Sequence, residues 1–326
     1  MPTSKSAEPP ARPAKDAPIL ITMGEPGGVG PELALRAWHE LNGRLGAHAL
    51  RLVGDPEVFR ASGRVSGDAV IATRPVSKPR QAGHAAPENA LAVTDAIETA
   101  VDLAVKGAAA AVVTAPIHKA AMIAGGFAFP GHTEFLAHLT GAERAVMMLA
   151  GPGLRVVPLT IHEPLATVPG LVTTRAIVAT GEIVLAALKR DFGITRPKLA
   201  VAGLNPHAGE AGEIGREEIE IIAPAVEALR GGGHNVTGPL SADTMFHAEA
   251  RARYDAALCM YHDQALIPIK TLAFWEGVNV TLGLPIVRTS PDHGTALDLA
   301  GTDKADLRSI LAAIDLAAKM ADARRR

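Results

Sequence analysis

The chain of 326 residues is poor in cysteine and in long apolar segments, and both absences limit where it can work. Its only cysteine is Cys259, so no disulfide can form within one chain, which is typical of a reducing compartment. No segment approaches the ~18 consecutive apolar residues of a membrane span. The basic N-terminus is not followed by the uninterrupted apolar stretch of a secretory signal. We therefore expect a cytoplasmic protein that does not bind a membrane.

The chain also has little net charge. It contains 32 basic and 34 acidic residues, which give a net charge of −2, and the two signs are mixed along the sequence. An extended basic surface for nucleic acid or for anionic lipid is therefore not expected. The one basic run, Arg324–Arg326, is predicted to be a solvated helix end.

Aromatic residues make up only 3% of the chain, whereas there are 12 histidines. The core must therefore be built from Ala, Val, Leu and Ile. The histidines stand out as candidates for chemistry.

The chain does have a regular alternation of short apolar runs and longer amphipathic segments. Its length predicts two domains, preceded by a disordered tail at residues 1–17, which is rich in Pro, Ala, Ser and Lys. Strands are expected at residues 19–23, 50–53, 111–114, 146–150, 154–160, 198–203, 257–261 and 278–282. Helices are expected at residues 31–42, 87–105, 132–140, 173–192, 216–230 and 303–323. This alternation predicts an α/β fold with parallel sheets, in which ligands bind beyond the carboxyl ends of the strands.

Three histidines each follow a predicted strand closely. His162 lies in the sequence IHEPL, His207 in NPHAGE and His262 in YHDQ. Their wide spacing does not suit a zinc finger, but it suits ligands gathered at one edge of a sheet. Three imidazoles with one open position are a pattern of catalytic zinc, and other divalent transition ions also accept imidazole. The other interpretation of each histidine is a structural hydrogen-bonding group.

Two aspartates lie near these histidines in the sequence. Asp243 and Asp263 are interpreted either as further ligands or as partners that orient an imidazole ring. Cys259 is close to His262, but we interpret it as a buried structural thiol.

The glycine-rich turn Met23–Glu32 (MGEPGGVGPE) follows a predicted strand and opens a predicted helix. Its backbone N–H groups could hold an anion at the helix N-terminus. The glycine spacing differs from that of a Rossmann fingerprint, and the Gly-Lys-Ser/Thr of a Walker loop is missing. An anion site and a plain tight turn both remain open.

Several polar residues suit an anionic substrate. His132 and Thr133 open a predicted helix, where the Thr133 hydroxyl could bind a phosphate or carboxylate, or could cap the helix. Lys270 lies in the sequence LIPIK, and Asn279 and Arg288 flank a predicted strand. A guanidinium suits bidentate contact with a carboxylate or phosphate.

The loop His293–Gly301 (HGTALDLAG) consists mainly of small residues. Small side chains let a flat ring or a ribose approach the backbone. An acidic residue such as Asp298 can hydrogen-bond a ribose 2′-hydroxyl and repel a 2′-phosphate.

Taken in order, eight motifs resemble the 4-hydroxythreonine-4-phosphate dehydrogenase family, NAD-dependent enzymes of pyridoxal phosphate synthesis. The motifs are GEPGGVGPE, TAPIHK, GHTEFLA, IHEPL, GLNPHAGE, YHDQALIPIK, VNVTLGLPIVRTS and DHGTALDLAG. The resemblance runs from about Ile19 to the C-terminal helix. It implies the fold of isocitrate and isopropylmalate dehydrogenases, with two α/β/α domains, a cleft between them and no Rossmann domain. Residues 18–135 and 290–326 would form the first, cofactor-side domain, and residues 136–289 the second, metal- and dimer-side domain.

The resemblance also implies roles for individual residues. The metal ligands would be His162, His207 and His262, with the third histidine supplied by the other subunit of a homodimer. The substrate-binding residues would be His132, Thr133, Lys270, Asn279 and Arg288. The cofactor loop would contribute His293, Gly294, Thr295, Ala296 and Asp298. Lys270, His132, Asp243 and Asp263 are the expected catalytic residues.

The reaction implied by the resemblance is the oxidation of 4-phosphohydroxy-L-threonine to 2-amino-3-oxo-4-phosphohydroxybutanoate, which decarboxylates to 3-amino-2-oxopropyl phosphate. NAD, or NADP, is the expected cofactor, together with Zn²⁺, Mg²⁺, Mn²⁺ or Co²⁺. A divalent cation acidifies a coordinated hydroxyl, nicotinamide accepts the hydride, and Lys270 is the first candidate for relaying the proton.

Three alternatives remain open. The first is a dehydrogenase of erythronate or threonate 4-phosphate, since the turn has Glu25, Gly27 and Val29 where the family usually has Asp, Ala and Ile. In addition, Ser290-Pro291 replaces the common Ser-Val. The second is a Zn-dependent hydrolase or aldolase, and the third is a two-lobed binding protein.

Overall fold

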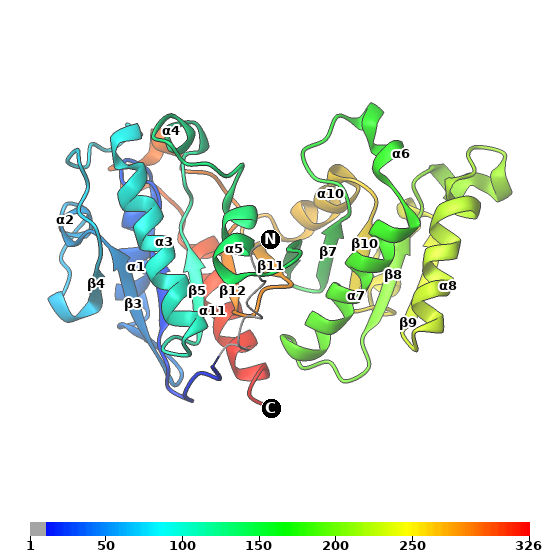
Figure 1. The fold of residues 1–326 in the computed structure, drawn as a ribbon, viewed down its shortest axis with the longest axis horizontal. Helices are drawn as coiled ribbons and strands as arrows, with labels where there is room; N and C mark the ends of the chain where they lie inside the picture. The colour runs from blue at the N-terminus through cyan, green and yellow to red at the C-terminus, as the bar shows by residue number, and fades with distance from the viewer. Residues whose placement is uncertain (1–10) are drawn as a thin grey trace, which may run out of the picture. The chain divides into compact units, whose positions relative to one another are not determined.

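The computed structural model describes residues 11–326, which divide into two compact units. The first unit contains the chain up to Ala145 and resumes at Leu284–Arg325, and the second contains Val146–Gly283. The sequence had suggested borders at residues 135–136 and 289–290. Each unit is a β-sheet with helices packed on it, so the chain is a mixed α/β protein as predicted (Figure 1).

The sheet of the first unit has the strand order β2-β3-β1-β5-β12, with β4 paired to β3. Its strands are β1 (Ile19–Thr22), β2 (Arg44–Leu45), β3 (His48–Gly54), β4 (Val70–Ala72), β5 (Ala111–Thr114) and β12 (Arg288–Pro291). The pairs β1–β3, β1–β5, β5–β12 and β3–β4 are parallel, and β2–β3 is antiparallel. Every residue of β1 and β5 is buried, as expected for central strands covered by helices on both faces.

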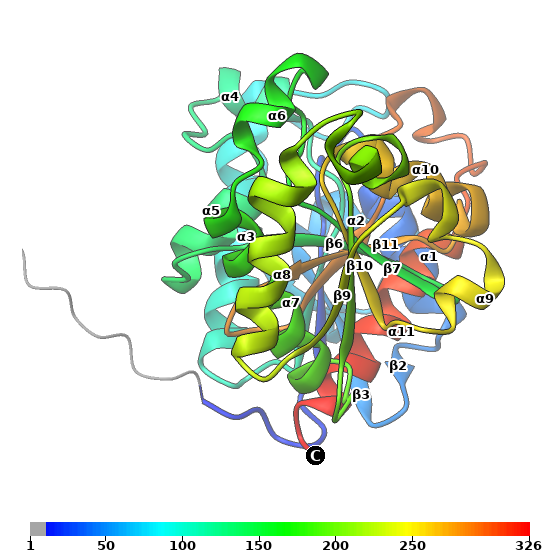
Figure 2. The same ribbon diagram turned by 90° about the vertical axis from the view of Figure 1, so that its right-hand side faces the viewer.

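Helices lie on both faces of this sheet. The longer ones are α1 (Gly30–Glu40), α3 (Ala90–Val105), α5 (His132–Thr140) and α11 (Arg308–Ala323), and the short ones are α2 (Pro56–Arg60) and α4 (Lys119–Ala124). α1 and α11 contact each other on one face, whereas α3 and α5 contact each other on the opposite face (Figure 2). The inner face of α3 is almost entirely alanine and valine, which lets the helix pack without aromatic side chains.

The sheet of the second unit has the order β11-β6-β7-β10-β8-β9. Its strands are β6 (Val146–Gly151), β7 (Leu154–Pro158), β8 (Lys198–Ala202), β9 (Asn235–Leu240), β10 (Ala256–Cys259) and β11 (Val278–Leu282). Strands β7, β10, β8 and β9 run parallel, but β6 runs antiparallel to both β11 and β7. The prediction of parallel sheets is therefore wrong for β6. The reason is the two-residue turn Pro152-Gly153, where a φ of +72° at Gly153 sends the chain straight back along β6.

Helices α7 (Thr174–Arg190) and α8 (Ala223–Gly231) lie together on one face of the second sheet. Helix α10 (His262–Ala273) packs on β6, β7 and β10 from the other face, and α6 (Val168–Leu171) and α9 (Ala248–Arg251) are short. Helix α10 was not predicted from the sequence, because it contains Pro268. A proline in a helix interior removes an N–H donor and clashes with the preceding turn, so it normally indicates a break.

Two predicted helices differ most from the structure in their bounds. The segment expected at residues 216–230 divides into a π-helical stretch, Glu218–Ile222, followed by α8. The closing helix begins at Arg308, five residues later than expected. Among residues 11–326, no single helix is long and apolar enough to cross a membrane; only the pair Leu165–Leu171 and Thr174–Arg190, bent by 87°, has the length and composition together.

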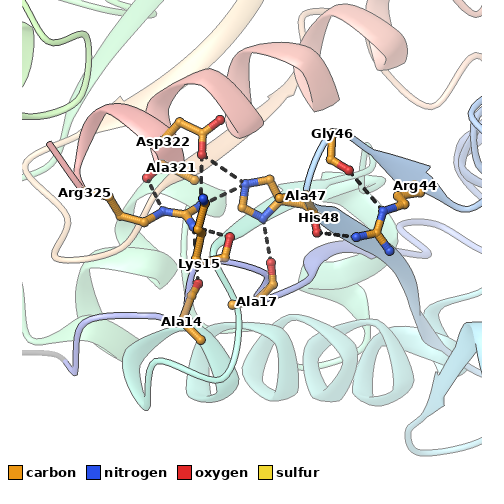
Figure 3. A network of polar contacts seen from close by, with 10 residues as sticks. All are labelled: Ala14, Lys15, Ala17, Arg44, Gly46, Ala47, His48, Ala321, Asp322 and Arg325. Carbon is orange, nitrogen blue, oxygen red and sulfur yellow. Dashed lines mark hydrogen bonds and ion pairs between the residues drawn. The ribbon is translucent and has the colours of Figure 1, made fainter.

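Residues 11–17, which were predicted to be disordered, are held against the end of α11. Ala17 is buried in a small cluster with Ala110 and Ala321. Its carbonyl oxygen lies 2.7 Å from Nδ1 of the buried His48 (Figure 3). The disorder prediction is therefore wrong for residues 11–17, while residues 1–10 lie outside the described part of the chain.

The basic run at the C-terminus also has partners. Arg325 Nη2 lies 2.9 Å from His48 Nε2 and 3.1 Å from Asp322 Oδ1, and Arg325 Nη1 donates to the carbonyl oxygens of Ala14 and Lys15 (Figure 3). Arg324 donates to carbonyl oxygens of the segment 284–286. The prediction of a solvated helix end is therefore wrong for Arg324 and Arg325, which tie the C-terminus to the start of β3 and to residues 14–15.

Candidate functional site

The three histidines leave the same edge of the second sheet. Strand β10 lies between β7 and β8, and its residue Cys259 is opposite Pro158 of β7. His262 follows β10, His162 follows β7 and His207 follows β8. Because these strands are parallel, their carboxyl ends meet at one edge, which is where α/β folds bind ligands.

His162 and His262 lie next to each other at this edge, with their rings tilted by 41°. Their ring centroids are 5.7 Å apart, and the Thr160 hydroxyl joins the two strand ends by donating to the carbonyl oxygen of Met260 at 2.8 Å. Nδ1 of His262 lies 2.6 Å from Oδ1 of Asp263. This contact orients the ring and leaves Nε2 for a ligand, which is the usual arrangement of a histidine–carboxylate pair at a metal.

The spacing of these two rings suits a shared cation. With Zn–N bonds of ~2.0–2.1 Å and tetrahedral geometry, two bound imidazoles have centroids about 5 Å apart. The His162 and His262 rings are therefore close to the separation that one bound ion requires.

His207 is placed differently, in a left-handed turn after β8 where its φ is +52°. It lines a hollow of about 300 Å³ with Asn205, Ser241, Asp243, Tyr261 and Gln264. Within residues 11–326, no three side chains of His, Cys, Asp or Glu come close enough to hold one metal ion. One chain therefore pairs His162 with His262 but does not add His207 to them.

Asp243 lies at the rim of this hollow and is exposed. A hydrogen bond from the Ser241 hydroxyl, and to a smaller degree the charge of His207, lower the pKa of its carboxyl group. Asp243 is therefore an anion at neutral pH and can accept protons or hydrogen bonds from a ligand. The neighbouring Cys259 is completely buried, and burial raises the pKa of its thiol, which agrees with a structural role.

In the first unit, a histidine and two cations converge at the N-terminus of α5. Nε2 of His132 is buried and has no hydrogen-bond partner among the residues described. Burial, followed by the positive charges of Arg288 and Lys119, lowers the pKa of His132 well below its ordinary value. A neutral imidazole with an unused nitrogen between two cations is a site that favours a phosphate or carboxylate.

Arg288 begins β12 and is 3% exposed. Its Nη2 and Nε lie 2.6 and 3.2 Å from the Thr114 hydroxyl at the end of β5, because β12 pairs with β5 in parallel register. Burial lowers the pKa of Arg288 to about 10, so the guanidinium remains charged at neutral pH.

The lowered pKa of His132 predicts a dependence of stability on pH. Because the folded-state pKa lies below the unfolded value of ~6.5, the unfolded chain binds more protons in acid. The contribution of neutral His132 to the free energy of unfolding is therefore complete above about pH 6.5, and it is lost as the pH falls toward the folded-state pKa. In urea unfolding from pH 8 to 5, we expect the wild type to lose more stability than His132→Asn. Parallel curves for the two proteins would contradict this expectation.

Thr133 is not the N-cap of α5, so that interpretation is wrong. The helix begins at His132 and is preceded by Gly131, whose extended backbone (φ −175°) occupies the cap position. The Thr133 hydroxyl is therefore in the first turn, where it remains a proposed substrate contact.

The glycine-rich turn packs between the loops that contain Pro116 and Thr295. The N–H groups of Glu25, Gly27 and Val29 donate to the Pro116 carbonyl, the Glu25 carboxylate and the Thr295 carbonyl. These groups are therefore engaged within the protein, which favours the tight turn over the anion site. The Glu25 side chain is buried, and desolvation raises the pKa of its carboxyl group.

Replacement of Gly27 by alanine should be strongly destabilising. A Cβ at this position would lie 1.9 Å from the carbonyl oxygen of His84, a backbone atom that cannot move alone. We expect a loss of about 2–4 kcal/mol in urea unfolding. Gly67→Ala, where a Cβ meets nothing within 4 Å, is the matched control and should stay within about 0.5 kcal/mol of the wild type. Equal stabilities of the two variants would contradict the packing model.

The loop His293–Gly301 is fastened to α1. The Gly301 N–H donates to Glu32 Oε1 at 2.6 Å, and Arg80 Nη2 donates to the same oxygen at 3.1 Å. Thr295 is buried against the glycine-rich turn, and Ala296 has a φ of +40°. His293, Gly294 and Asp298 are exposed, and a Cβ at Gly294 would meet nothing within 4 Å. The loop thus offers an open backbone at Gly294 and an exposed carboxylate at Asp298, which fit a nucleotide.

Lys270 and Asn279 both belong to the second unit. Lys270 lies on the same face of α10 as His262, two i+4 steps further along, in a shallow hollow lined by His262, Asp263, Leu266, Ile267, Lys270 and Thr271. Eight residues of helix span about 12 Å, so Lys270 and His262 of one chain are not adjacent. Asn279 is half-buried in β11 opposite Leu149.

Some residues that shape these sites were missed. Lys119 ends the motif TAPIHK after β5, and its position after a strand was an available signal. Gln264 accepts from Met260 N and donates to the Gly203 carbonyl, so it locks the end of β10 to that of β8. Glu218 is buried within a predicted helix, where no sequence signal marked it.

Comparison with known proteins gives the family. The model of "Pyridoxal phosphate biosynthetic protein PdxA" matches residues 42–317. The chain belongs to the PdxA family. It is 52% identical to a 4-hydroxythreonine-4-phosphate dehydrogenase of Caulobacter vibrioides (93% of this chain, 97% of the relative) and 53% identical to one of Roseobacter denitrificans (94% and 97%). A crystal structure of the enzyme from Klebsiella pneumoniae superposes with a TM-score of 0.83 at 38% identity, covering 94% of this chain and 99% of that one. The resemblance seen in the sequence is thus confirmed.

Proposed function

We propose that this PdxA-family protein oxidises 4-phosphohydroxy-L-threonine to 2-amino-3-oxo-4-phosphohydroxybutanoate, which decarboxylates to 3-amino-2-oxopropyl phosphate. The proposal uses NAD, with NADP as the alternative cofactor, and a divalent cation. It includes the isocitrate/isopropylmalate dehydrogenase type of fold without a Rossmann domain, and a cytoplasmic location.

One observation carries the choice of substrate. The buried Nε2 of His132 lies between the charges of Lys119 and Arg288, and it has no partner among the described residues. A phosphorylated amino acid supplies the anionic groups that such a site requires, and dehydrogenases with this substrate in their name are the relatives at about 50% identity.

We assign His162, His207 and His262 as the metal ligands. The 5.7 Å separation of His162 and His262 supports a shared ion, and a second subunit would complete the ligand set, since the described residues of one chain bring no third candidate ligand to this pair. Four apolar side chains on and just after α10 are 45–63% exposed, as expected of an interface. They are Ile267, Leu272, Phe274 and Trp275. When bound, the cation would make the substrate hydroxyl more acidic and stabilise the alkoxide.

The remaining steps belong to residues of the chain itself. Arg288 and the His132-Thr133 turn would hold the anionic ends of the substrate, helped by Asn279. Asp263 would keep the His262 ring oriented, Asp243 and Lys270 are the groups that can move a proton, and Lys270 is the first choice. The loop residues His293, Gly294, Thr295, Ala296 and Asp298 would contact the dinucleotide, with Asp298 on the ribose.

The test is NADH formation with 4-phosphohydroxythreonine, phosphoerythronate and phosphothreonate, each with and without chelator. We expect turnover with the amino acid substrate, lost with chelator and restored by added metal. Preference for a sugar-acid phosphate would move the protein to the alternative dehydrogenase. Metal-dependent hydrolysis or aldol cleavage without NAD would contradict the dehydrogenase itself.

A further inference from the structure

The turn that carries His207 has an uncommon backbone. Five consecutive residues, His207–Ala211, have φ between +42° and +78°, and only Gly209 among them is glycine. L-residues in this region suffer a clash between Cβ and the carbonyl oxygen, so a left-handed turn of this length persists only where its surroundings impose it.

The carboxylate of Glu218, which is 3% exposed, lies beside this turn. Its Oε1 accepts the N–H groups of Leu204 and Asn205, both at 2.7 Å, and its Oε2 accepts the Asn205 side-chain amide at 2.9 Å. A Cβ on Gly209 would lie 2.6 Å from Oε2, so the turn wraps directly around the carboxylate.

The π-helical stretch explains how Glu218 reaches this position. Within Glu218–Ile222, Glu218 is buried against the turn, whereas Glu220 is exposed and pairs with Arg216. The wider π turn changes the directions of successive side chains relative to an α-helix, a feature often found beside functional sites.

We propose that Glu218 is a positioning residue that holds His207 in its left-handed turn and thereby preorganises it as a metal ligand. The inference rests on the proposed function, because it takes His207 to bind the cation. Glu218 does not touch the metal; it acts through the backbone of residues 204–211. The left-handed backbone costs free energy. Contacts with Glu218 offset this cost in the metal-free protein, so metal binding does not have to supply it.

The test compares Glu218→Ala and Glu218→Gln with Glu220→Gln as the matched control on the same π-helical stretch. Zn²⁺ affinity is measured by competition with a chromophoric chelator, and amide hydrogen exchange of residues 204–212 is measured on metal-free protein. We expect Glu218→Ala to weaken Zn²⁺ binding 10–100-fold and to speed exchange. Glu218→Gln keeps one oxygen for the two backbone N–H groups and should recover part of the affinity, while Glu220→Gln should match the wild type.

A second readout separates positioning from general damage. In Glu218→Gln, the Zn²⁺ concentration for half-maximal activity should rise, while kcat at saturating Zn²⁺ should stay near that of the wild type. Wild-type Zn²⁺ affinity in Glu218→Gln would overturn the positioning role. So would faster amide exchange of residues 204–212 without a loss of Zn²⁺ affinity. If Glu218→Ala does not fold, the result with Glu218→Gln decides. Failure of the wild type to bind Zn²⁺ would instead overturn the metal in the proposed function.

Discussion

Replacing His162 by alanine is expected to lower metal-supported turnover about 10³-fold. The cation would contribute several kcal/mol to alkoxide stabilisation, and each 1.4 kcal/mol is a tenfold change in rate. His162 and His262 form the one pair of candidate-ligand rings in contact, with centroids 5.7 Å apart, so the loss of either ring removes half of this pair. The measurement is NADH formation across a metal titration, together with the metal content per chain.

His247→Ala is the matched control for this experiment. His247 is exposed like His162 and contacts the carboxylate of Glu249, but it lies outside the predicted ligand set. Its turnover and metal content should equal those of the wild type. Normal turnover in His162→Ala, with metal still bound, would remove His162 from the site. Since His162 is exposed, its loss should leave the thermal midpoint nearly unchanged.

Replacing Arg288 by methionine is the second change with a large expected effect. Truncating one partner of a buried, hydrogen-bonded charge pair costs about 2–5 kcal/mol, so kcat/KM should fall about 10²–10³-fold. Arg288→Lys keeps the charge but not the planar fork that suits phosphate and carboxylate, so its kcat/KM should be intermediate. Steady-state kinetics with the phosphorylated substrate provide the measurement.

The control for Arg288 is Arg308→Ala. Arg308 is exposed and pairs with Asp306, at the start of α11. Removing it should change kcat/KM by less than twofold. If Arg288→Met kept wild-type kcat/KM, the anion site at the N-terminus of α5 would have to be abandoned.

The parts of the candidate site that follow strands were predictable from sequence. A polar residue directly after a buried parallel strand must emerge at the carboxyl edge of the sheet, wherever the rest of the chain goes. This reasoning correctly placed His162, His207 and His262 at one edge, because β7, β10 and β8 are neighbours. Strand β5 and helix α5 have the predicted bounds, because their apolar patterns are local features of the sequence.

Features that depend on tertiary packing were not predictable. Helix α10 was not predicted because it contains Pro268, and proline normally breaks a helix. Its packing on three strands offsets this local cost. The left-handed turn at His207 packs against a carboxylate further along the chain, and no local pattern encodes this contact. The contacts of Arg324 and Arg325 could not be predicted because their acceptors are backbone carbonyl oxygens. Every residue has such an oxygen, so the sequence does not mark which ones accept.

The contacts of Arg325 tie the C-terminal helix to the segment around residue 14. Its guanidinium binds the carbonyl oxygens of Ala14 and Lys15, so the C-terminus and residue 14 are within the reach of one side chain. A chain that starts near residue 14 could therefore be joined to its C-terminus by a short linker, because segments that lie this close tolerate circular permutation. The permuted chain could then begin and end at an exposed turn of the first unit, so that a fusion or surface attachment would be made away from residues 14–15 and α11.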